Sequence, residues 1–166
     1  AIHSENNFPT AAGLASSASG FAALAVAAAQ AAGLRLSLGE LSSHARKSSA
    51  SAARSLFEGF AILRKEEDEG EALLARNHWD VAMVVAVIGS GPKAIGSTGG
   101  MVQTKNTCPY YPAWEAVAPS VYEDLKAGVE TRDFTRVAEA MEHSTRLMHA
   151  TMITSLPPVL YLKGAT

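Results

Sequence analysis

A run of small polar residues and glycines near the start of the chain has the composition of a phosphate-binding loop. Residues 6–20 read Asn-Asn-Phe-Pro-Thr-Ala-Ala-Gly-Leu-Ala-Ser-Ser-Ala-Ser-Gly and lead directly into an Ala-rich apolar segment. The first backbone N–H groups of a helix lack intrahelical partners and carry partial positive charge, so an anion is stabilised beside them. We therefore interpret this stretch as a loop that places phosphate at the N-terminus of a helix.

Several residues of this loop have the chemistry that a phosphate site needs. Gly13 and Gly20 permit backbone angles that a Cβ would penalise, and the hydroxyls of Ser16, Ser17 and Ser19 suit phosphate oxygens or Mg²⁺. The loop has no lysine, so it is not a Walker-A motif, and the neutralising cation must come from elsewhere. The residues alone leave a plainer alternative open, in which a serine only caps the helix and the glycines only form turns.

The composition is that of a globular protein with a substantial core. Of the 166 residues, 48% are hydrophobic and 18% are charged. A formal net charge of -2 argues against a nucleic-acid partner, which normally requires a basic excess. The apolar run of residues 21–32 is too short to cross a bilayer, and the single Cys108 is consistent with a reducing compartment. We therefore expect a soluble, cytoplasmic protein without a membrane partner.

The hydrophobic pattern predicts the elements that must position the loop. We expect the end of a strand over residues 1–6 and a helix over about 14–33, which ends at Gly33 because glycine favours a C-terminal cap. A second helix is expected over about 38–47, with Ser37 as its N-cap.

The middle of the chain predicts two strands and a solvated loop. Residues 60–63 read as a strand, and the charge run of residues 65–71 reads as a solvated hairpin or loop. Residues 79–88 contain an unbroken apolar run rich in β-branched side chains, which is typical of a strand buried on both faces. The change in composition at the charge run divides the chain into two predicted domains, residues 1–70 and residues 71–166.

Two helices are expected in the last third of the chain. The first spans about residues 113–127 and contains Pro119, at a kink or in a first turn. The second is capped by Asp133 and runs to about residue 152. We expect its apolar face to pack in the core, and this face comprises Phe134, Val137, Ala138, Met141, Thr145, Met148 and Met152.

Residues 6–24 resemble, almost residue for residue, the ATP-binding loop of diphosphomevalonate decarboxylases, which are members of the GHMP kinase superfamily. The resemblance implies that the loop binds the phosphates of ATP and that Ser17 takes part in catalysis and holds Mg²⁺. The implied phosphate-binding residues are Ala12, Gly13, Leu14, Ala15, Ser16, Ser17, Ser19 and Gly20.

Two further segments resemble substrate-binding segments of the same family. Residues 45–60 match a segment written A-R-x-G-S-G-S-A-C/S-R-S, which implies that Ser49, Ser51 and Arg54 bind the substrate and that Arg54 is catalytic. Residues 89–101 resemble the segment K-x-x-x-S-T-x-G-M, which implies that Ser97 and Lys93 face the substrate, while Thr98, Gly99 and Gly100 shape a loop.

Three residues stand where the family has glycine: Ser48, Ala50 and Glu58. Where the backbone needs a left-handed angle, Ala50 would be strained by roughly 1 to 2 kcal/mol. A carboxylate at Glu58 would repel an anionic substrate.

The resemblance implies an α/β fold (α+β, two layers) of the GHMP kinase type. A nucleotide-binding part like the second domain of ribosomal protein S5 would be followed by a second α/β domain, with the active site between them. The implied reaction uses ATP and Mg²⁺ to phosphorylate the 3-hydroxyl of mevalonate 5-diphosphate, and loss of phosphate and CO₂ then yields isopentenyl diphosphate. The implied partners are this small-molecule substrate and a second copy of the protein, in a homodimer.

Two parts of the family's machinery have no counterpart in the 166 residues, namely a Tyr/Lys motif before them and the Asp of a D-A-G-P-N segment after them. We therefore expect the chain to be a piece of a larger enzyme, inactive by itself, or a truncated relative without activity. Two other functions stay open. One is a GHMP-type mevalonate or phosphomevalonate kinase or decarboxylase with a different substrate, and the other is a noncatalytic fragment that keeps nucleotide or dimer contacts.

Overall fold

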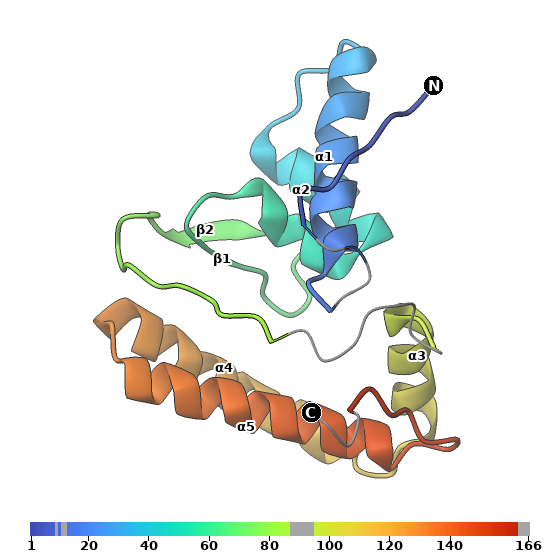
Figure 1. Ribbon diagram of the computed structural model, residues 1–166, viewed down its shortest axis with the longest axis vertical. Coiled ribbons are helices and arrows are strands. Elements are labelled where there is room, and N and C mark those ends of the chain that lie inside the picture. Colours follow the sequence, from blue (N-terminus) through green and yellow to red (C-terminus); the bar gives the residue numbers. More distant parts are fainter. Residues whose placement is uncertain (9, 11–12, 87–94, 163–166) are drawn as a thin grey trace. The chain divides into compact units, whose positions relative to one another are not determined.

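The computed structural model describes all of the chain except residues 9, 11–12, 87–94 and 163–166 (Figure 1). It divides into two compact units, Ala1–Pro92 and Lys93–Thr166, and each is described by itself. Among the described residues, no helix combines the length and the apolar character needed to cross a membrane.

The first unit is organised around helix α1, Ser16–Ala31, which consists mostly of alanine and serine. The helix ends in a Schellman motif. The Gly33 N–H donates to the Gln30 carbonyl at 3.0 Å, and the Leu34 N–H donates to the Ala29 carbonyl at 2.9 Å. Gly33 has a φ of +70°, which glycine adopts without a Cβ penalty. The predicted helix and its end at Gly33 are confirmed.

Helix α2, Leu38–Ser48, begins with a capping box. The Ser37 hydroxyl accepts the Glu40 backbone N–H at 3.2 Å, and the Glu40 carboxylate accepts the Ser37 backbone N–H at 2.7 Å. The prediction of Ser37 as N-cap is confirmed.

A 3-10 helix, η1 (Ala50–Leu56), follows α2 and packs against both α1 and α2. The chain then forms an antiparallel hairpin of β1, Phe60–Ile62, and β2, Glu71–Leu74 (Figure 1). Residues 64–69, which join the two strands, are all exposed. The strand predicted over residues 60–63 is therefore confirmed. The charge run is solvated over residues 65–69, whereas Gly70 is buried and Glu71 begins β2. The predicted domain boundary between residues 70 and 71 lies between β1 and β2, and the limits of the domains stay a prediction.

Two other predicted strands are wrong for this structure. Residues 1–6 and the described part of the second strand, residues 79–86, have no regular secondary structure. Val84 is 95% exposed and Met83 is 79% exposed, so the apolar run is not buried. A strand needs a neighbour to satisfy its backbone hydrogen bonds, and in the described part of the chain β1 and β2 pair only with each other. Residues 87 and 88, also predicted in this strand, lie outside the described residues.

The second unit contains three helices, α3 (Ser97–Thr107), α4 (Tyr111–Thr131) and α5 (Phe134–Ile153). Helices α4 and α5 form an antiparallel pair (Figure 1). The Asp133 side chain caps α5 by accepting the Arg136 N–H at 3.0 Å, and Pro119 lies inside α4. The two helices predicted here are confirmed. Helix α3 was not predicted, since its first residues had been interpreted as a loop.

The predicted apolar face of α5 is buried only towards the C-terminus of the helix. Met152 is 1% exposed, whereas Met141 is 50% and Phe134 is 70% exposed. Of the predicted face, Val137 lies against Gly128 of α4, and the buried Ala140 beside it is not a member of that face. The prediction that the whole face packs in the core is therefore wrong.

Because of the capping box of α2, we expect the free energy of unfolding to depend on pH. The hydrogen bonds from the backbone and side chain of Ser37 lower the pKa of Glu40 below its ordinary value of 4.5. A lowered pKa stabilises the folded state above pH 4.5, and this contribution is lost as the pH falls through the folded pKa. The difference in unfolding free energy between the parent and Glu40→Gln, measured by denaturant titration, should therefore be largest at neutral pH and shrink on acidification. Glu67→Gln, in the exposed charge run, is the control, and a constant difference from pH 7 to pH 3 would contradict the prediction.

Candidate active site

The loop before α1 has the backbone geometry of an anion-binding site. Ala15 is the N-cap of α1 and lies in the left-handed region, with φ 51° and ψ 42°, while Ser16 begins the right-handed helix. Successive residues of opposite hand point their N–H groups into one concavity, which attracts anions. Gly13, two residues earlier, has a φ of +86°. A left-handed alanine is unfavourable by itself, and such conformations concentrate at functional sites.

The plainer interpretation of the loop serines fails. The N-cap of α1 is Ala15, and no side chain caps the helix. Ser17 is the second residue of α1 and is exposed, so its hydroxyl lies in the first turn where a ligand can reach it. The Ser19 hydroxyl donates to the Ser16 carbonyl at 3.2 Å. The polar residues of the loop are thus not explained as caps.

The structure contradicts the prediction for one loop residue, Gly20, and does not describe another, Ala12. Gly20 was expected to adopt an angle that a Cβ would penalise, but it lies in α1 and is absent from the described residues of positive φ. A Cβ at Gly20 would contact nothing within 4 Å, so neither backbone angle nor space requires glycine there. Leu14 is half-buried, and Ala12 lies outside the described residues.

Helix η1 brings together the side chains that were predicted to bind the substrate. The hydroxyls of Ser49 and Ser51 are 3.1 Å apart. Ser51 and Arg54 are three residues apart in a 3-10 helix, where positions i and i+3 lie one above the other. Arg54 is exposed, and no ion pair joins it to a carboxylate in the described part of the chain. Two hydroxyls and an available guanidinium therefore share one face, which can bind a carboxylate or phosphate.

A buried serine that the sequence analysis did not identify holds η1 in place. The Ser42 hydroxyl, with the residue 0% exposed, donates to the Ala53 carbonyl of η1 at 2.9 Å and accepts the Gly70 N–H at 2.8 Å. It thereby joins α2, η1 and the segment before β2. A sequence signal was present, because Ser42 stands beside Leu41 and three residues before Ala45 on the buried face of α2.

Helices α1 and η1 also border a common groove of about 470 Å³. Ser19, from the first turns of α1, and Ser55, beside Arg54 in η1, both line it. Its floor is formed by small apolar side chains of α1, those of Ala22, Ala23, Val26 and Ala27. The groove therefore runs along α1 from Ser19 to Gln30, and the C-terminal end of η1 borders it.

The three departures from family glycines do not strain the backbone. Among the described residues other than glycine, positive φ occurs only at Ala15, Glu66 and Arg132, so Ser48, Ala50 and Glu58 are all free of it. The strain expected at Ala50 is therefore absent. In contrast, the neighbouring Gly59 has a φ of +73°, and a Cβ there would lie 2.5 Å from the Leu74 carbonyl oxygen. Gly59, where the backbone requires a glycine, is therefore still a glycine in this chain.

The remaining predicted site residues belong to the second unit. Ser97 is the first residue of α3, and Thr98, Gly99 and Gly100 continue its first turn, so the predicted loop is a helix N-terminus instead. No side chain caps this helix at Gly96. Lys93 lies outside the described residues. The structure thus joins Ser49, Ser51 and Arg54 in the first unit, and it places Ser97 separately, in the second.

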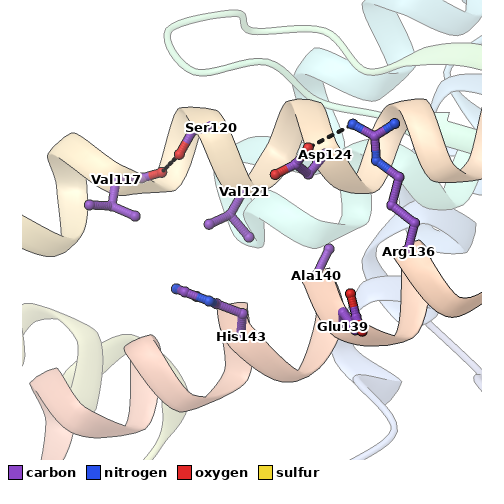
Figure 2. A pocket seen from close by; sticks show the side chains of 8 residues that line it. All are labelled: Val117, Ser120, Val121, Asp124, Arg136, Glu139, Ala140 and His143. Carbon is purple, nitrogen blue, oxygen red and sulfur yellow. Dashed lines mark hydrogen bonds and ion pairs between the residues drawn. The ribbon is translucent and has the colours of Figure 1, made fainter.

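A second groove, of about 460 Å³, lies between α4 and α5 (Figure 2). Arg136 and Asp124 form an ion pair of 2.7 Å across it, and His143 and Glu139 extend from α5 (Figure 2). None of the predicted site residues lines this groove. Within the described residues, no three His, Cys, Asp or Glu side chains are grouped so that they could hold a metal ion. The groove is therefore not the candidate active site.

A left-handed residue before an uncapped helix N-terminus, and a Ser/Arg face on a helix that packs against it, are suited to binding phosphorylated ligands. Comparison with known proteins identifies the fold as an α/β fold of the GHMP kinase type.

The chain belongs to the diphosphomevalonate decarboxylase family. Residues 1–75 match the diphosphomevalonate decarboxylase-like N-terminal domain, and residues 83–166 match the mevalonate 5-diphosphate decarboxylase C-terminal domain. A diphosphomevalonate decarboxylase of Eremothecium gossypii is 40% identical over 173 residues, which cover 99% of this chain and 44% of that protein. The chain thus spans less than half the length of this curated relative.

Solved structures agree with this assignment. Mevalonate diphosphate decarboxylase from Staphylococcus aureus has a TM-score of 0.81 and 37% identity, over 95% of this chain and 49% of that one. A structure described as MDDEF in complex with MVAPP, AMPPCP and magnesium has a TM-score of 0.82 and 36% identity, over 95% of this chain and 50% of that one.

The position of Ser42 generates a stability prediction. Ser42→Ala leaves the Ala53 carbonyl and the Gly70 N–H buried without this partner, and each unsatisfied group costs about 1 to 3 kcal/mol. We expect the unfolding free energy of the full-length protein to fall by about 2 kcal/mol or more, measured by denaturant unfolding. The adjacent Ser43→Ala, at a half-buried position, should change stability by less than about 0.5 kcal/mol. Equal effects of the two substitutions would contradict the role of Ser42.

Proposed function

We propose that the full-length protein catalyses the ATP-dependent decarboxylation of mevalonate 5-diphosphate to isopentenyl diphosphate. The observation that carries the proposal is the packing of η1, with Ser49, Ser51 and Arg54, against the helix that begins at the left-handed loop. Support comes from family membership and from the related structure in complex with MVAPP, AMPPCP and magnesium. Because the chain spans about half of its relatives, the activity is proposed for the whole protein.

In this proposal the loop binds the ATP phosphates. The N–H groups at the start of α1 and the Ser17 hydroxyl stabilise charge on the transferred phosphoryl group, where catalysis depends mainly on positioning and electrostatics. The oxygen of Ser17 is a ligand type that Mg²⁺ accepts, and the described residues offer no carboxylate cluster beside it. The ion, when bound, neutralises phosphate charge, so most of its ligands would be phosphate oxygens and water.

Arg54, Ser49 and Ser51 act on the substrate. Phosphorylation of the 3-hydroxyl converts it into a good leaving group. The C–O bond then breaks with its electron pair leaving on phosphate, the C–C bond to the carboxylate breaks to release CO₂, and that pair forms the new double bond. The guanidinium of Arg54 holds the carboxylate in line for this step, while the serine hydroxyls donate to substrate oxygens.

The proposal also covers the oligomeric state of the enzyme and the compartment in which it acts. We propose a homodimer that acts in the cytoplasm, on the small-molecule substrate and ATP alone. Light scattering of the full-length protein measures its mass in solution, and a monomer mass at micromolar concentration would contradict the dimer.

The inactivity of the 166 residues by themselves also stays a prediction. Its test is an assay of ATP-dependent phosphate and CO₂ release by this chain.

The loop assignment predicts a specific loss of nucleotide affinity. Ser17→Asp places a negative charge beside the phosphates, although an acidic residue in a first helical turn normally stabilises the helix. We expect the Kd for ATP, measured by calorimetry on the full-length protein, to rise at least about tenfold. Thr135→Asp makes the same change at the second residue of α5 and should leave the Kd unchanged. An unchanged Kd in Ser17→Asp would show that the loop does not bind the phosphates.

The role of Arg54 predicts a loss of turnover with intact ATP binding. Arg54→Lys keeps the charge but removes the planar two-pronged donor, and kcat should fall about 10²-fold or more. Arg76→Lys, at another exposed arginine, is the control and should retain full activity. Measuring ADP and CO₂ separately distinguishes the decarboxylase from a kinase, since a kinase releases ADP without CO₂. Unchanged turnover in Arg54→Lys would assign Arg54 a structural role only.

A further inference from the structure

The segment after α5 turns back and runs along the whole length of α3. We name residues 155–161 the C-terminal strap. The Leu156 N–H donates to the Thr107 hydroxyl at 2.8 Å, at the last residue of α3. The Gln103 side-chain amide donates to the Pro157 carbonyl, and the Tyr161 hydroxyl donates to the Ile95 carbonyl at 3.0 Å, just before α3 begins. The strap therefore contacts α3 from its C-terminus to its N-terminus.

The far end of the strap packs tightly on the first turn of α3. Gly100 is buried, and a Cβ added there would lie 2.6 Å from the Tyr161 hydroxyl oxygen and 3.4 Å from a methyl carbon of Val159. Val159 is 1% exposed. The Tyr161 hydroxyl would have to shift to admit a Cβ at position 100, so the contact in its present form requires glycine there.

Further hydrogen bonds fix the position of both sides of this contact, the strap and the first turn of α3. The Val159 N–H donates to the Met152 carbonyl at 3.0 Å, which anchors the strap on the end of α5. On the other side, the fully buried Thr104 donates its hydroxyl to the Gly100 carbonyl at 2.8 Å, and the Gly100 N–H donates to Gly96 at 2.9 Å. Tyr161 therefore reaches the first turn of α3 from a fixed position.

This turn needs external support. It contains Gly99 and Gly100, each of which disfavours helix by roughly 1 kcal/mol relative to alanine, and it has no side-chain cap. Left alone, such a turn frays, because its first N–H groups also lack intrahelical partners. Burial raises the pKa of the Tyr161 phenol above its ordinary value of 10.0, so the hydroxyl remains a proton donor at neutral pH.

We propose that Tyr161 is a positioning residue, which holds the first turn of α3 in its helical form and so fixes the position of Ser97, a predicted substrate-binding residue. Ser97 is the first residue of this turn, three positions before the contact at Gly100. The role of Ser97 rests on the proposed function, whereas the clamp on the turn rests on the contacts alone.

A double-mutant cycle in the full-length protein tests the clamp. Tyr161→Phe removes one hydrogen bond, and the KM for mevalonate 5-diphosphate should rise about 3- to 10-fold, with the KM for ATP unchanged. Gly100→Ala introduces a clash with the Tyr161 hydroxyl and should raise the same KM further. In the double variant the clashing oxygen is gone, so its KM should resemble that of Tyr161→Phe instead of the product of the two effects. Tyr110→Phe, at a 63% exposed tyrosine, is the control.

Amide hydrogen exchange at Gly100, whose N–H is bonded to the Gly96 carbonyl, gives a second readout, which does not depend on activity. Faster exchange in Tyr161→Phe than in the parent supports the clamp, and unchanged exchange overturns it. If the parent is active and Tyr161→Phe has the same KM as the parent, the positioning role is wrong, even if the substitution lowers the stability of the protein. If the effects of Tyr161→Phe and Gly100→Ala on this KM are independent of each other, the two residues do not interact, and the proposed contact is wrong. A full-length parent that does not turn over mevalonate 5-diphosphate refutes the proposed function instead, and the exchange data then decide the clamp.

Discussion

The hydroxyl of Ser42 is the interaction on which the first unit depends. Helix η1 has the weak hydrogen bonding of a 3-10 helix, and such helices rarely extend far without support. Ser42 supplies that support from α2 by bonding to the Ala53 carbonyl and the Gly70 N–H, and it leaves neither group unsatisfied. Because η1 carries Ser51 and Arg54, the geometry of the candidate substrate site follows from a buried serine that has no contact with the substrate face.

Small side chains make this arrangement possible. Ala52 and Ala53 of η1 are fully buried. The buried residues of α1 and α2 are also small apart from Leu41, and they are Ala18, Ala22, Ala29, Ser42 and Ala45. Small residues contribute little apolar area each, but they let helix backbones approach closely. The close approach places the start of α1 and the Ser/Arg face of η1 in one compact unit, as the proposed reaction between two bound ligands requires.

The glycines in the two candidate segments differ in what they do. At Gly59 the backbone has a positive φ and no room for a Cβ, whereas Ala50 and Glu58 occupy family glycine positions at no conformational cost. Glu58 therefore leaves the backbone unstrained, and its predicted repulsion of an anionic substrate rests on its charge. At Gly100 the constraint comes from the strap, since the Tyr161 hydroxyl occupies the space of a side chain.

The sequence by itself determined the features that depend on a few neighbouring residues. The capping box of Ser37 and Glu40, the cap of Asp133 and the helix end at Gly33 are all local hydrogen-bond patterns, and each was predictable. The loop before α1 was predicted from its small residues and from the family resemblance, and its left-handed residue was not predicted.

Only the tertiary structure decided what depends on contacts between distant segments. Residues 79–86 have the composition of a buried strand, but in the described part of the chain no strand pairs with them, and hydrophobicity cannot replace a backbone partner. Residues 97–100 have the composition of a loop, and they are helical where Tyr161, more than sixty residues away, packs on them. Composition reports what a segment prefers alone, whereas burial and hydrogen bonding to distant residues select the conformation that it adopts.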